Sequence, residues 1–319
     1  MIKVGLNSDG TAAGAVADAQ LAEACGFDYF GCGEHVFAPV PTPNAFVVLA
    51  AAAGATSHIR LISSITLLPL YPIALAAKMA TTLDVVSGGR FELGIGAGGE
   101  FPPEFLATGV DPDTRFRRVD EGLRVLKMLF SGRQEDFAGE FTTLTGVALD
   151  PAPLQPGGPP IWVAGRKGGA ARRAGRHGSV WLPYLVEPGA VAAGLALARA
   201  AAESAGRAPA EVSAGLFIWV CADRDRNWAI RTGISTVSTS YRQDFAANAD
   251  RWLAVGSPDG VTERLSEYVA AGADHLLVQI AAPPEHRQRV IETLASDVLP
   301  SLRRNAALPE IDPRRRIRG

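Results

Sequence analysis

Short apolar runs alternate with helical stretches eight times along this chain of 319 residues, and this alternation constrains the fold more than any other feature. Strands separated by helices form parallel sheets. Eight such units over this length predict a closed (β/α)8 TIM barrel, an α/β fold. The expected strands cover residues 2–7, 27–35, 59–68, 90–98, 161–165, 179–183, 212–223 and 274–281.

A polar stretch rich in proline and glycine, residues 133–160, separates the fourth unit from the fifth. Because the alternation resumes after it, we interpret it as an insertion between the fourth and fifth strands of one barrel. We expect residues 133–158 of this insertion and residues 225–258 to shape the substrate pocket. Residues 1–304 then form a single domain, and residues 305–319 form a basic tail that we expect to be mobile.

Composition excludes several classes of function. The net charge of −2 gives no global field that would attract nucleic acid or an anionic membrane. No run approaches the ~18 apolar residues of a membrane span. The N-terminus begins as a strand without a signal-peptide core. Cys25, Cys32 and Cys221 show neither zinc nor C-x-x-C spacing, which indicates a reducing compartment. We therefore expect a cytoplasmic protein.

A run of glycines ends the fourth expected strand. Gly94, Gly96 and Gly99 satisfy the G-x-G-x-x-G spacing of dinucleotide sites, but Pro102 and Pro103 follow so closely that the dinucleotide interpretation is weak. Active sites of TIM barrels lie at the C-terminal ends of the strands. The glycines there predict a flat backbone floor for a large planar ligand, and the alternative is a glycine-rich turn without a ligand.

A second glycine-rich turn, residues 165–169, follows the fifth expected strand and leads into a helix. Free N–H groups at a helix N-terminus attract anions, and Arg166 and Lys167 add positive charge. We therefore predict a phosphate site here. The alternative is a solvent-facing turn that carries two solvated cations.

His35 is the one histidine of five that follows the C-terminal end of an expected strand. This position makes it a candidate proton donor or polar ligand contact, although a lone histidine is often structural. The adjacent Glu34 should face the opposite way. A metal-dependent hydrolase needs several metal-ligating side chains at strand ends, and His35 is the one clear example, so we predict no metal.

The motifs "GEHVFAP", "RLISSITLLPLYPIALAAKMATTLDVVSGGRFELGIGAGG" and "DPAPLQPGGPPIWVAGRKGGAARRAGRHG" together resemble the bacterial luciferase-like family of flavin or deazaflavin oxidoreductases. The resemblance covers residues 1 to about 300. It is closest to the branch that uses the deazaflavin coenzyme F420.

This resemblance implies a cofactor ring across the third and fourth strand ends, supported by a non-proline cis peptide bond at Ser64–Ile65. It places the cofactor phosphate on the turn at residues 165–169, and His35 beside the ring and the substrate. Together with Asn7, which follows from its place at the end of the first strand, the predicted cofactor-binding residues are Ser64, Ile65, Gly96, Gly98, Gly165, Arg166, Gly168 and Gly169.

The implied reaction is hydride transfer between F420 and a small organic substrate, with His35 exchanging the proton. Two alternatives remain open: an FMNH2-dependent monooxygenase that uses O2, and a non-catalytic cofactor-binding protein of the same family. Glu100 is either a proton-transfer group or a solvated side chain. Because relatives often dimerise, we also expect a homodimer. The sequence does not identify the substrate.

Overall fold

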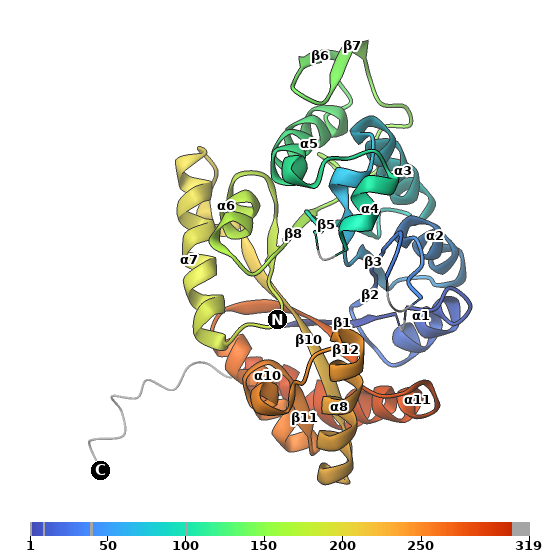
Figure 1. Cartoon of the computed structure of the whole chain (residues 1–319), viewed down its shortest axis with the longest axis vertical. Helices are drawn as coiled ribbons and strands as arrows, with labels where there is room; N and C mark the ends of the chain where they lie inside the picture. The colour runs from blue at the N-terminus through green and yellow to red at the C-terminus, as the bar shows by residue number, and fades with distance from the viewer. Residues whose placement is uncertain (1, 9, 39–40, 100, 308–319) are drawn as a thin grey trace.

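The computed structural model describes residues 2–8, 10–38, 41–99 and 101–307, in which eight parallel strands close into a barrel (Figure 1). Strand β10 pairs with both β9 and β12, and this double pairing closes the sheet. The predicted TIM barrel is confirmed. The barrel strands are β1 (Lys3–Asn7), β2 (Tyr29–Cys32), β3 (Arg60–Ser63), β5 (Phe91–Gly96), β8 (Ile161–Ala164), β9 (Val180–Leu182), β10 (Ser213–Ala222) and β12 (Ala273–Ile280).

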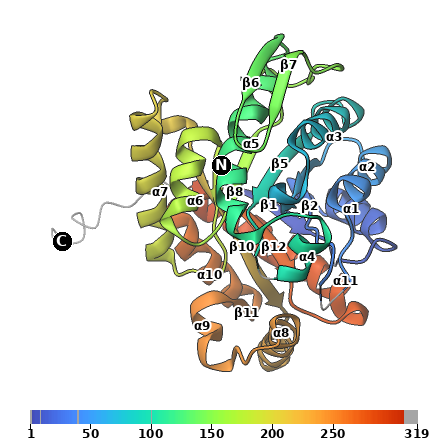
Figure 2. The same ribbon diagram turned by 45° about the horizontal axis from the view of Figure 1, so that its top comes forward.

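Helices surround the barrel and cover its outer face (Figure 2). The larger ones are α1 (Ala15–Ala24), α2 (Ala45–Ala55), α3 (Ile73–Val86), α5 (Arg115–Phe130), α6 (Gly168–His177), α7 (Pro188–Ser204), α8 (Arg226–Tyr241), α10 (Pro258–Ala270), α11 (Pro284–Thr293) and α12 (Leu299–Ala307). Short elements complete the chain: α4 (Pro102–Ala107), α9 (Ala249–Trp252), β4 (Thr66–Leu67), β6 (Glu135–Ala138), β7 (Thr143–Val147) and β11 (Ala254–Gly256).

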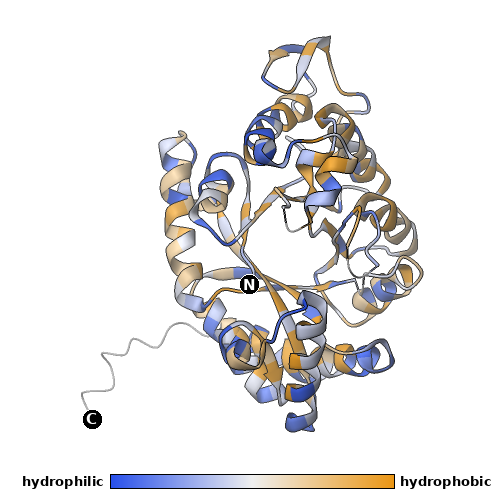
Figure 3. Cartoon of the chain, in the orientation of Figure 1, coloured by the Kyte–Doolittle hydropathy of each residue, from blue (hydrophilic) through white to orange (hydrophobic). Residues whose placement is uncertain are grey.

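The apolar side chains of the strands divide into two cores, as their alternation requires. The larger core lies between strands and helices, and the smaller one fills the barrel interior. Figure 3 shows the apolar character of the strands that separate these cores. The interior core consists of Tyr29, Ile62, Trp162, Val180, Leu182 and Leu277.

The segment between β5 and β8 contains the hairpin β6–β7, which lies on the outer side of α5 (Figure 1). Its tip is held by Glu121 of α5, whose carboxylate accepts the N–H of Glu140 at 2.6 Å and that of Phe141 at 3.0 Å. After the hairpin, Asp84 at the end of α3 accepts the N–H of Leu154 at 2.7 Å. Because residues 133–158 connect α5 to β8, they lie at the N-terminal end of the barrel, opposite the end where TIM barrels bind their ligands. The expectation that they shape the substrate pocket is therefore wrong.

The segment that follows β10 lies at the opposite end. Strand β11 extends the sheet by pairing with β10 over Val220–Ala222, at the C-terminal end of that strand. Residues 225–258 therefore remain candidates for the substrate side of the barrel.

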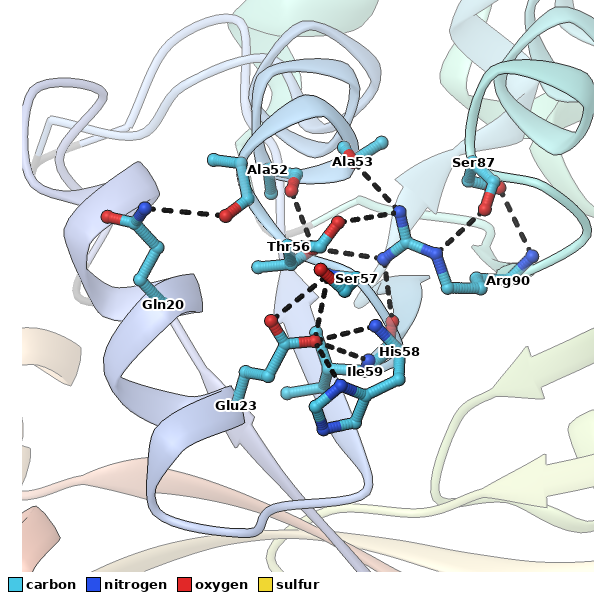
Figure 4. Close-up of polar contacts among 11 residues, drawn as sticks. Gln20, Glu23, Ala52, Ala53, Thr56, Ser57, His58, Ile59, Ser87 and Arg90 are labelled. Atoms are coloured by element: carbon cyan, nitrogen blue, oxygen red, sulfur yellow. Dashed lines mark hydrogen bonds and ion pairs between the residues drawn. The ribbon is translucent and has the colours of Figure 1, made fainter.

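Polar contacts tie the N-terminal end of the barrel together (Figure 4). Glu23 of α1 accepts the N–H groups of His58 at 2.6 Å and of Ile59 at 3.0 Å, just before β3. Arg90 donates to the carbonyls of Ala53 at 2.8 Å and of Ile59 at 3.0 Å. The last carbonyls of a helix lack partners within it, so Arg90 completes the end of α2.

The described chain ends with α12, whose last residue is Ala307. The basic tail predicted from residue 305 thus begins inside this helix, and its residues 308–319 lie outside the described residues. Within the described ranges, none of the helices combines the length and apolar character needed to cross a bilayer.

Candidate active site

Three polar side chains form a buried hydrogen-bonded chain at the C-terminal end of the barrel. Asn7 donates from Nδ2 to Oε1 of Gln279 at 2.6 Å, and its Oδ1 accepts the hydroxyl of Ser64. Gln279 also donates to the carbonyl of Ser8 at 3.2 Å. The chain links the ends of β1, β3 and β12. The polar atoms of Asn7 and Ser64, both predicted cofactor contacts, therefore bond to each other.

The Ser64–Ile65 peptide bond is cis, as the family resemblance implies. Two glycines of β5 make room for the segment around this bond. A Cβ built at Gly96 would lie 1.8 Å from Cδ1 of Ile65, and one at Gly94 would lie 2.0 Å from the carbonyl oxygen of Ser63. The chain itself therefore requires these glycines. Our explanation of them as space cleared for a ligand is wrong, while contact between Gly96 and a cofactor stays a prediction.

The two glycines after β5 have a different role. Gly98 and Gly99 adopt φ angles of +62° and +114°, in the region that favours glycine. A Cβ built at Gly99 would lie 3.0 Å from Nε of Arg115, the first residue of α5. This Nε is buried and has no hydrogen-bond partner among the described residues. A buried donor without a partner is costly, so Arg115 is suited to an acceptor supplied by a ligand.

His35 and Glu104 form a hydrogen-bonded pair beside this run. Nδ1 of His35 lies 3.0 Å from Oε1 of Glu104, which is the third residue of α4. The other oxygen of Glu104 accepts the N–H of Val36 at 2.6 Å, and the edge of Phe101 contacts the imidazole, with ring centroids 5.0 Å apart. A carboxylate only accepts hydrogen bonds, so it holds the hydrogen on Nδ1 and leaves Nε2 for proton exchange.

The two members of this pair differ in exposure. The His35 side chain is 25% exposed, whereas that of Glu104 is 1% exposed. A substrate can therefore reach the imidazole while the carboxylate that orients it stays away from solvent.

Glu34 points away from His35, as expected for neighbours in an extended segment. It accepts the N–H of Leu67 at 3.0 Å and the hydroxyl of Tyr71 at 2.9 Å, and Asn44 also donates to it. Burial raises the pKa of Glu34, although these donors stabilise its anionic form. Its role is to join the loop after β2 to β4 and to the start of α2.

Gly165 ends β8 with a φ of +140°, where other residues would be strained. Its N–H donates to the carbonyl of Leu182 at 3.1 Å, and its carbonyl accepts Nε1 of Trp181 at 2.8 Å. The N–H of Gly165 is therefore not free for a phosphate, and binding at this turn depends on the residues that follow.

The N-terminus of α6 offers those groups. Lys167 is the N-cap residue and makes no side-chain capping bond. The first N–H groups of a helix, here those of Gly168 and Gly169, have no partner within the helix. The guanidinium of Arg166 lies over the ring of Tyr184, 5.1 Å from its centroid. Two cationic residues thus precede two N–H groups that have no partner within the helix, and the anion site at this turn stays a prediction.

Aromatic side chains of β10 line the barrel on the side of β12. Phe217 packs against the interior core, and Trp219, two residues further on, packs against the larger core, with the two ring centroids 6.4 Å apart. Both are half-buried, and Trp219 Nε1 donates to the hydroxyl of Tyr241 at 3.4 Å. Trp219 is paired in register with Gln279, so these rings lie next to the Asn7 chain of hydrogen bonds.

A family model described as luciferase-like monooxygenase matches residues 2–275, most of the chain. The chain belongs to this luciferase-like family. Its fold, the cis peptide bond and the histidine after β2 agree with the resemblance noted in the sequence.

The relatives of this luciferase-like protein use two kinds of cofactor. An F420-dependent glucose-6-phosphate dehydrogenase of Kineococcus radiotolerans is 30% identical over 307 residues, which cover 86% of this chain and 87% of the relative. The oxygenase component of a flavin-dependent trigonelline monooxygenase of Acinetobacter baylyi is 35% identical over 150 residues, 46% of this chain and 41% of the relative. The crystal structure of monooxygenase RslO1 from Streptomyces bottropensis superposes with a TM-score of 0.83 at 26% identity, covering 94% of this chain and 99% of that chain.

The predicted residues of the luciferase-like protein fall into three groups at one end of the barrel. The first is the strand-end group with the cis peptide bond, the second is His35, and the third is the N-terminus of α6. Sequence reasoning missed Glu104 and Arg115, which lie just beyond the glycine run. Glu100 lies outside the described residues. Across the described chain, there is no group of three or more His, Cys, Asp or Glu side chains that could hold a metal.

Proposed function

We propose that this chain is an oxidoreductase that transfers hydride between coenzyme F420 and a small organic substrate. The observation that carries the proposal is the His35–Glu104 pair at the C-terminal end of the barrel, where TIM-barrel enzymes hold their catalytic groups. A relative that is 30% identical and covers 86% of this chain is an F420-dependent glucose-6-phosphate dehydrogenase. An oriented imidazole with an accessible Nε2 is the group that an alcohol or carbonyl substrate needs for proton exchange.

The residues at this end of the barrel fit such a cofactor. Ile65 presents its side chain at the cis peptide bond, Arg115 has a buried N–H that lacks an acceptor among the described residues, and α6 begins without a side-chain cap. We propose that the cofactor contacts Asn7, Ser64, Ile65, Gly96 and Gly98 with its ring and sugar-alcohol chain. We propose that its phosphate binds the N–H groups of Gly168 and Gly169 and the side chain of Arg166, while Gly165 forms the turn that places them.

A bound deazaflavin supplies hydride transfer, and the chain supplies binding, orientation and the proton. Nε2 of His35 would accept a proton from a substrate hydroxyl, or return one to a carbonyl oxygen. Glu104 stabilises the imidazolium that forms, because its carboxylate faces Nδ1. The substrate would meet the rings of Phe217 and Trp219 across the barrel end, which favours a substrate with an apolar portion.

An FMNH2-dependent monooxygenase is the second candidate, because RslO1 and the trigonelline oxygenase component are monooxygenases in name. A non-catalytic cofactor-binding protein is the third. Such a protein would keep the cofactor contacts, but it would not need the accessible imidazole of His35 that Glu104 orients.

Anaerobic titration with F420 and with FMN, each in its oxidised and reduced form, separates these candidates. We expect F420 to quench protein fluorescence at lower concentration than FMN, and reduced F420 to transfer hydride to a ketone from a panel that also includes sugar phosphates. Tighter binding of reduced FMN, together with oxygen consumption, would favour the monooxygenase. Binding of neither cofactor would refute the proposal.

We further propose that the chain forms a cytoplasmic homodimer through α2 and α3. Helix α2 contains no polar residue, yet Val47 is 69% exposed, and Leu75 of α3 is 51% exposed. A helix that is apolar on all sides is normally buried. Sedimentation should give a dimer for the wild type and a monomer for Val47→Glu, and a monomeric wild type would contradict the proposal.

The three free cysteines support the cytoplasmic part of this proposal, because thiols stay reduced in a reducing compartment.

A further inference from the structure

A groove of about 420 Å³ lies between α6 and α7, which run side by side on the outside of the barrel (Figures 1 and 2). One wall carries Arg172 and Arg176 of α6. The other is formed mainly by small residues of α7, among them Ala200, Ala201 and Ser204. These small side chains leave the two guanidinium groups accessible along its length.

The groove is continuous with the anion site at the N-terminus of α6. A Cβ built at Gly168 would lie 2.8 Å from Cδ2 of Leu197 and 3.4 Å from Nη1 of Arg172, and both residues line the groove. Arg176 follows one helical turn later, a rise of about 6 Å. Groups that extend from an anion bound at Gly168 would therefore meet first Arg172 and then Arg176.

Neither arginine is neutralised within the part of the chain that the structure describes, since neither forms an ion pair there. Arg173, on the neighbouring face of the same helix, is instead bonded to both oxygens of Asp120, at 2.6 and 2.9 Å. Positive charge also dominates around the next residue, His177. Burial, and then the charges of Lys127 and Arg176, lower the pKa of His177 to about 4. The groove thus combines space with uncompensated positive charge.

We propose that this groove binds an oligoanionic tail that extends beyond the cofactor phosphate, namely the glutamyl carboxylates of F420. The inference rests on the proposed function and explains how the chain distinguishes F420 from FMN, because FMN ends at its phosphate. Arg172 and Arg176 each face a carboxylate of the tail, and the small side chains of α7 leave room for its backbone.

The test compares two forms of the cofactor, one with several glutamyl residues and one truncated at the phospholactyl group. Affinities are measured by cofactor fluorescence without substrate. We expect the long form to bind about three- to tenfold more tightly to the wild type, as two accessible ion pairs allow. The variant Arg172→Gln/Arg176→Gln should lose this difference while its affinity for the truncated form is unchanged. Both side chains are exposed, so its thermal unfolding should match that of the wild type.

The control variant is Arg199→Gln/Arg231→Gln, which removes the same net charge from exposed positions of α7 and α8 outside this groove. It should retain the preference for the long form. Without any substitution, the affinity for the long form should also fall more steeply with added KCl. Equal affinity of the wild type for both forms, or an equal loss for both in the groove variant, would overturn the inference and leave the proposed function intact. Failure to bind either form would overturn both.

Discussion

At the N-terminal end of the barrel, the buried charges have partners from the chain itself. Arg90 donates to carbonyls at the end of α2 and before β3. Glu92, which is 5% exposed, pairs with Arg60 and accepts Nε1 of Trp162 inside the barrel. Tyr29 and His275 complete this interior layer, with the phenol oxygen 3.3 Å from Nδ1 of the imidazole.

The C-terminal end differs in the groups that the chain leaves unsatisfied. Arg115 has a buried Nε without a partner among the described residues, and α6 begins without a side-chain cap. A buried donor without a partner costs stability unless a ligand completes it. We infer that the N-terminal end of the barrel contributes mainly to stability and the C-terminal end mainly to binding, as in TIM barrels generally. Substitutions at each end should therefore have separable effects.

The largest expected effect is that of His35→Ala at the C-terminal end. Loss of a positioned acid–base group should lower kcat by about 10²–10⁴-fold, because proton transfer then depends on water. The cofactor affinity should hold, and the free energy of unfolding should fall by about 1–3 kcal/mol, because the buried Oε1 of Glu104 loses its partner. The measurements are steady-state turnover with F420, cofactor titration and urea unfolding.

His58→Ala is the matched control, because this histidine lies at the N-terminal end. Its side chain is 77% exposed and contacts Glu23 at 3.0 Å. Turnover by this variant should equal that of the wild type. If His35→Ala also turned over at the wild-type rate, the imidazole would have no catalytic role and the non-catalytic candidate would gain support.

The second effect is that of Glu92→Leu, which should reduce stability but not cofactor affinity. Removing one partner of a buried ion pair leaves Arg60 and the indole N–H of Trp162 without their acceptor. The expected cost is about 3 kcal/mol, at the lower end of the range for buried pairs because the Arg60 side chain is 30% exposed. Urea unfolding measures the cost, and F420 titration checks that binding is retained.

The double variant Arg60→Met/Glu92→Leu separates the cost of an unpaired charge from that of lost packing. Replacing both members of a buried pair by apolar residues is often nearly neutral, so most of the stability should return. If the double variant were as unstable as Glu92→Leu, the loss would come from packing around Trp162.

The barrel could be predicted from the sequence because its eight apolar runs carry enough β-branched and aromatic residues to mark each strand. The positions of His35 and of the turn at residues 165–169 followed directly, since strand ends define the catalytic end of this fold. These predictions needed only the order of elements along the chain.

Contacts between segments far apart in the sequence could not be predicted in this way. Glu104 meets His35 across 69 residues, and nothing in either segment identifies the other as its partner. The glycines of β5 were misread for the same reason, because the atoms that occupy their space come from Ile65 and Ser63. Spacing showed that side chains were absent there, but only the structure shows what fills the space.

The third effect tests whether the side chain of Ile65 is the reason that position 96 requires glycine. In Gly96→Ala, the new methyl group would lie 1.8 Å from Cδ1 of Ile65, at the end of a flexible side chain. Repacking should cost about 1–3 kcal/mol. Ile65→Val removes Cδ1, so the double variant should be more stable than the sum of the single effects predicts. Urea unfolding of all four proteins measures this coupling. Additive effects would show that Ile65 does not set the requirement for glycine.

The smallest expected effect concerns the pH dependence of stability and uses His275 at the N-terminal end. Burial, and then the charge of Lys3, lower the pKa of His275 to about 4 from its ordinary value of 6.5. Between these values the unfolded chain binds more protons than the folded one, so the free energy of unfolding falls as the pH drops from 6.5 toward 4. One histidine contributes at most about 1.4 kcal/mol per pH unit.

His275→Gln removes this titration and should flatten the decline measured by urea unfolding between pH 7.5 and 4.5. Its absolute stability at pH 7.5 will also change, because the ring packs against Trp162 with centroids 4.8 Å apart. The slope is therefore the informative quantity. If the slopes of the wild type and the variant were the same, His275 would not be held neutral in the folded chain. The interior layer at this end would then depend on packing and the Glu92 pair alone.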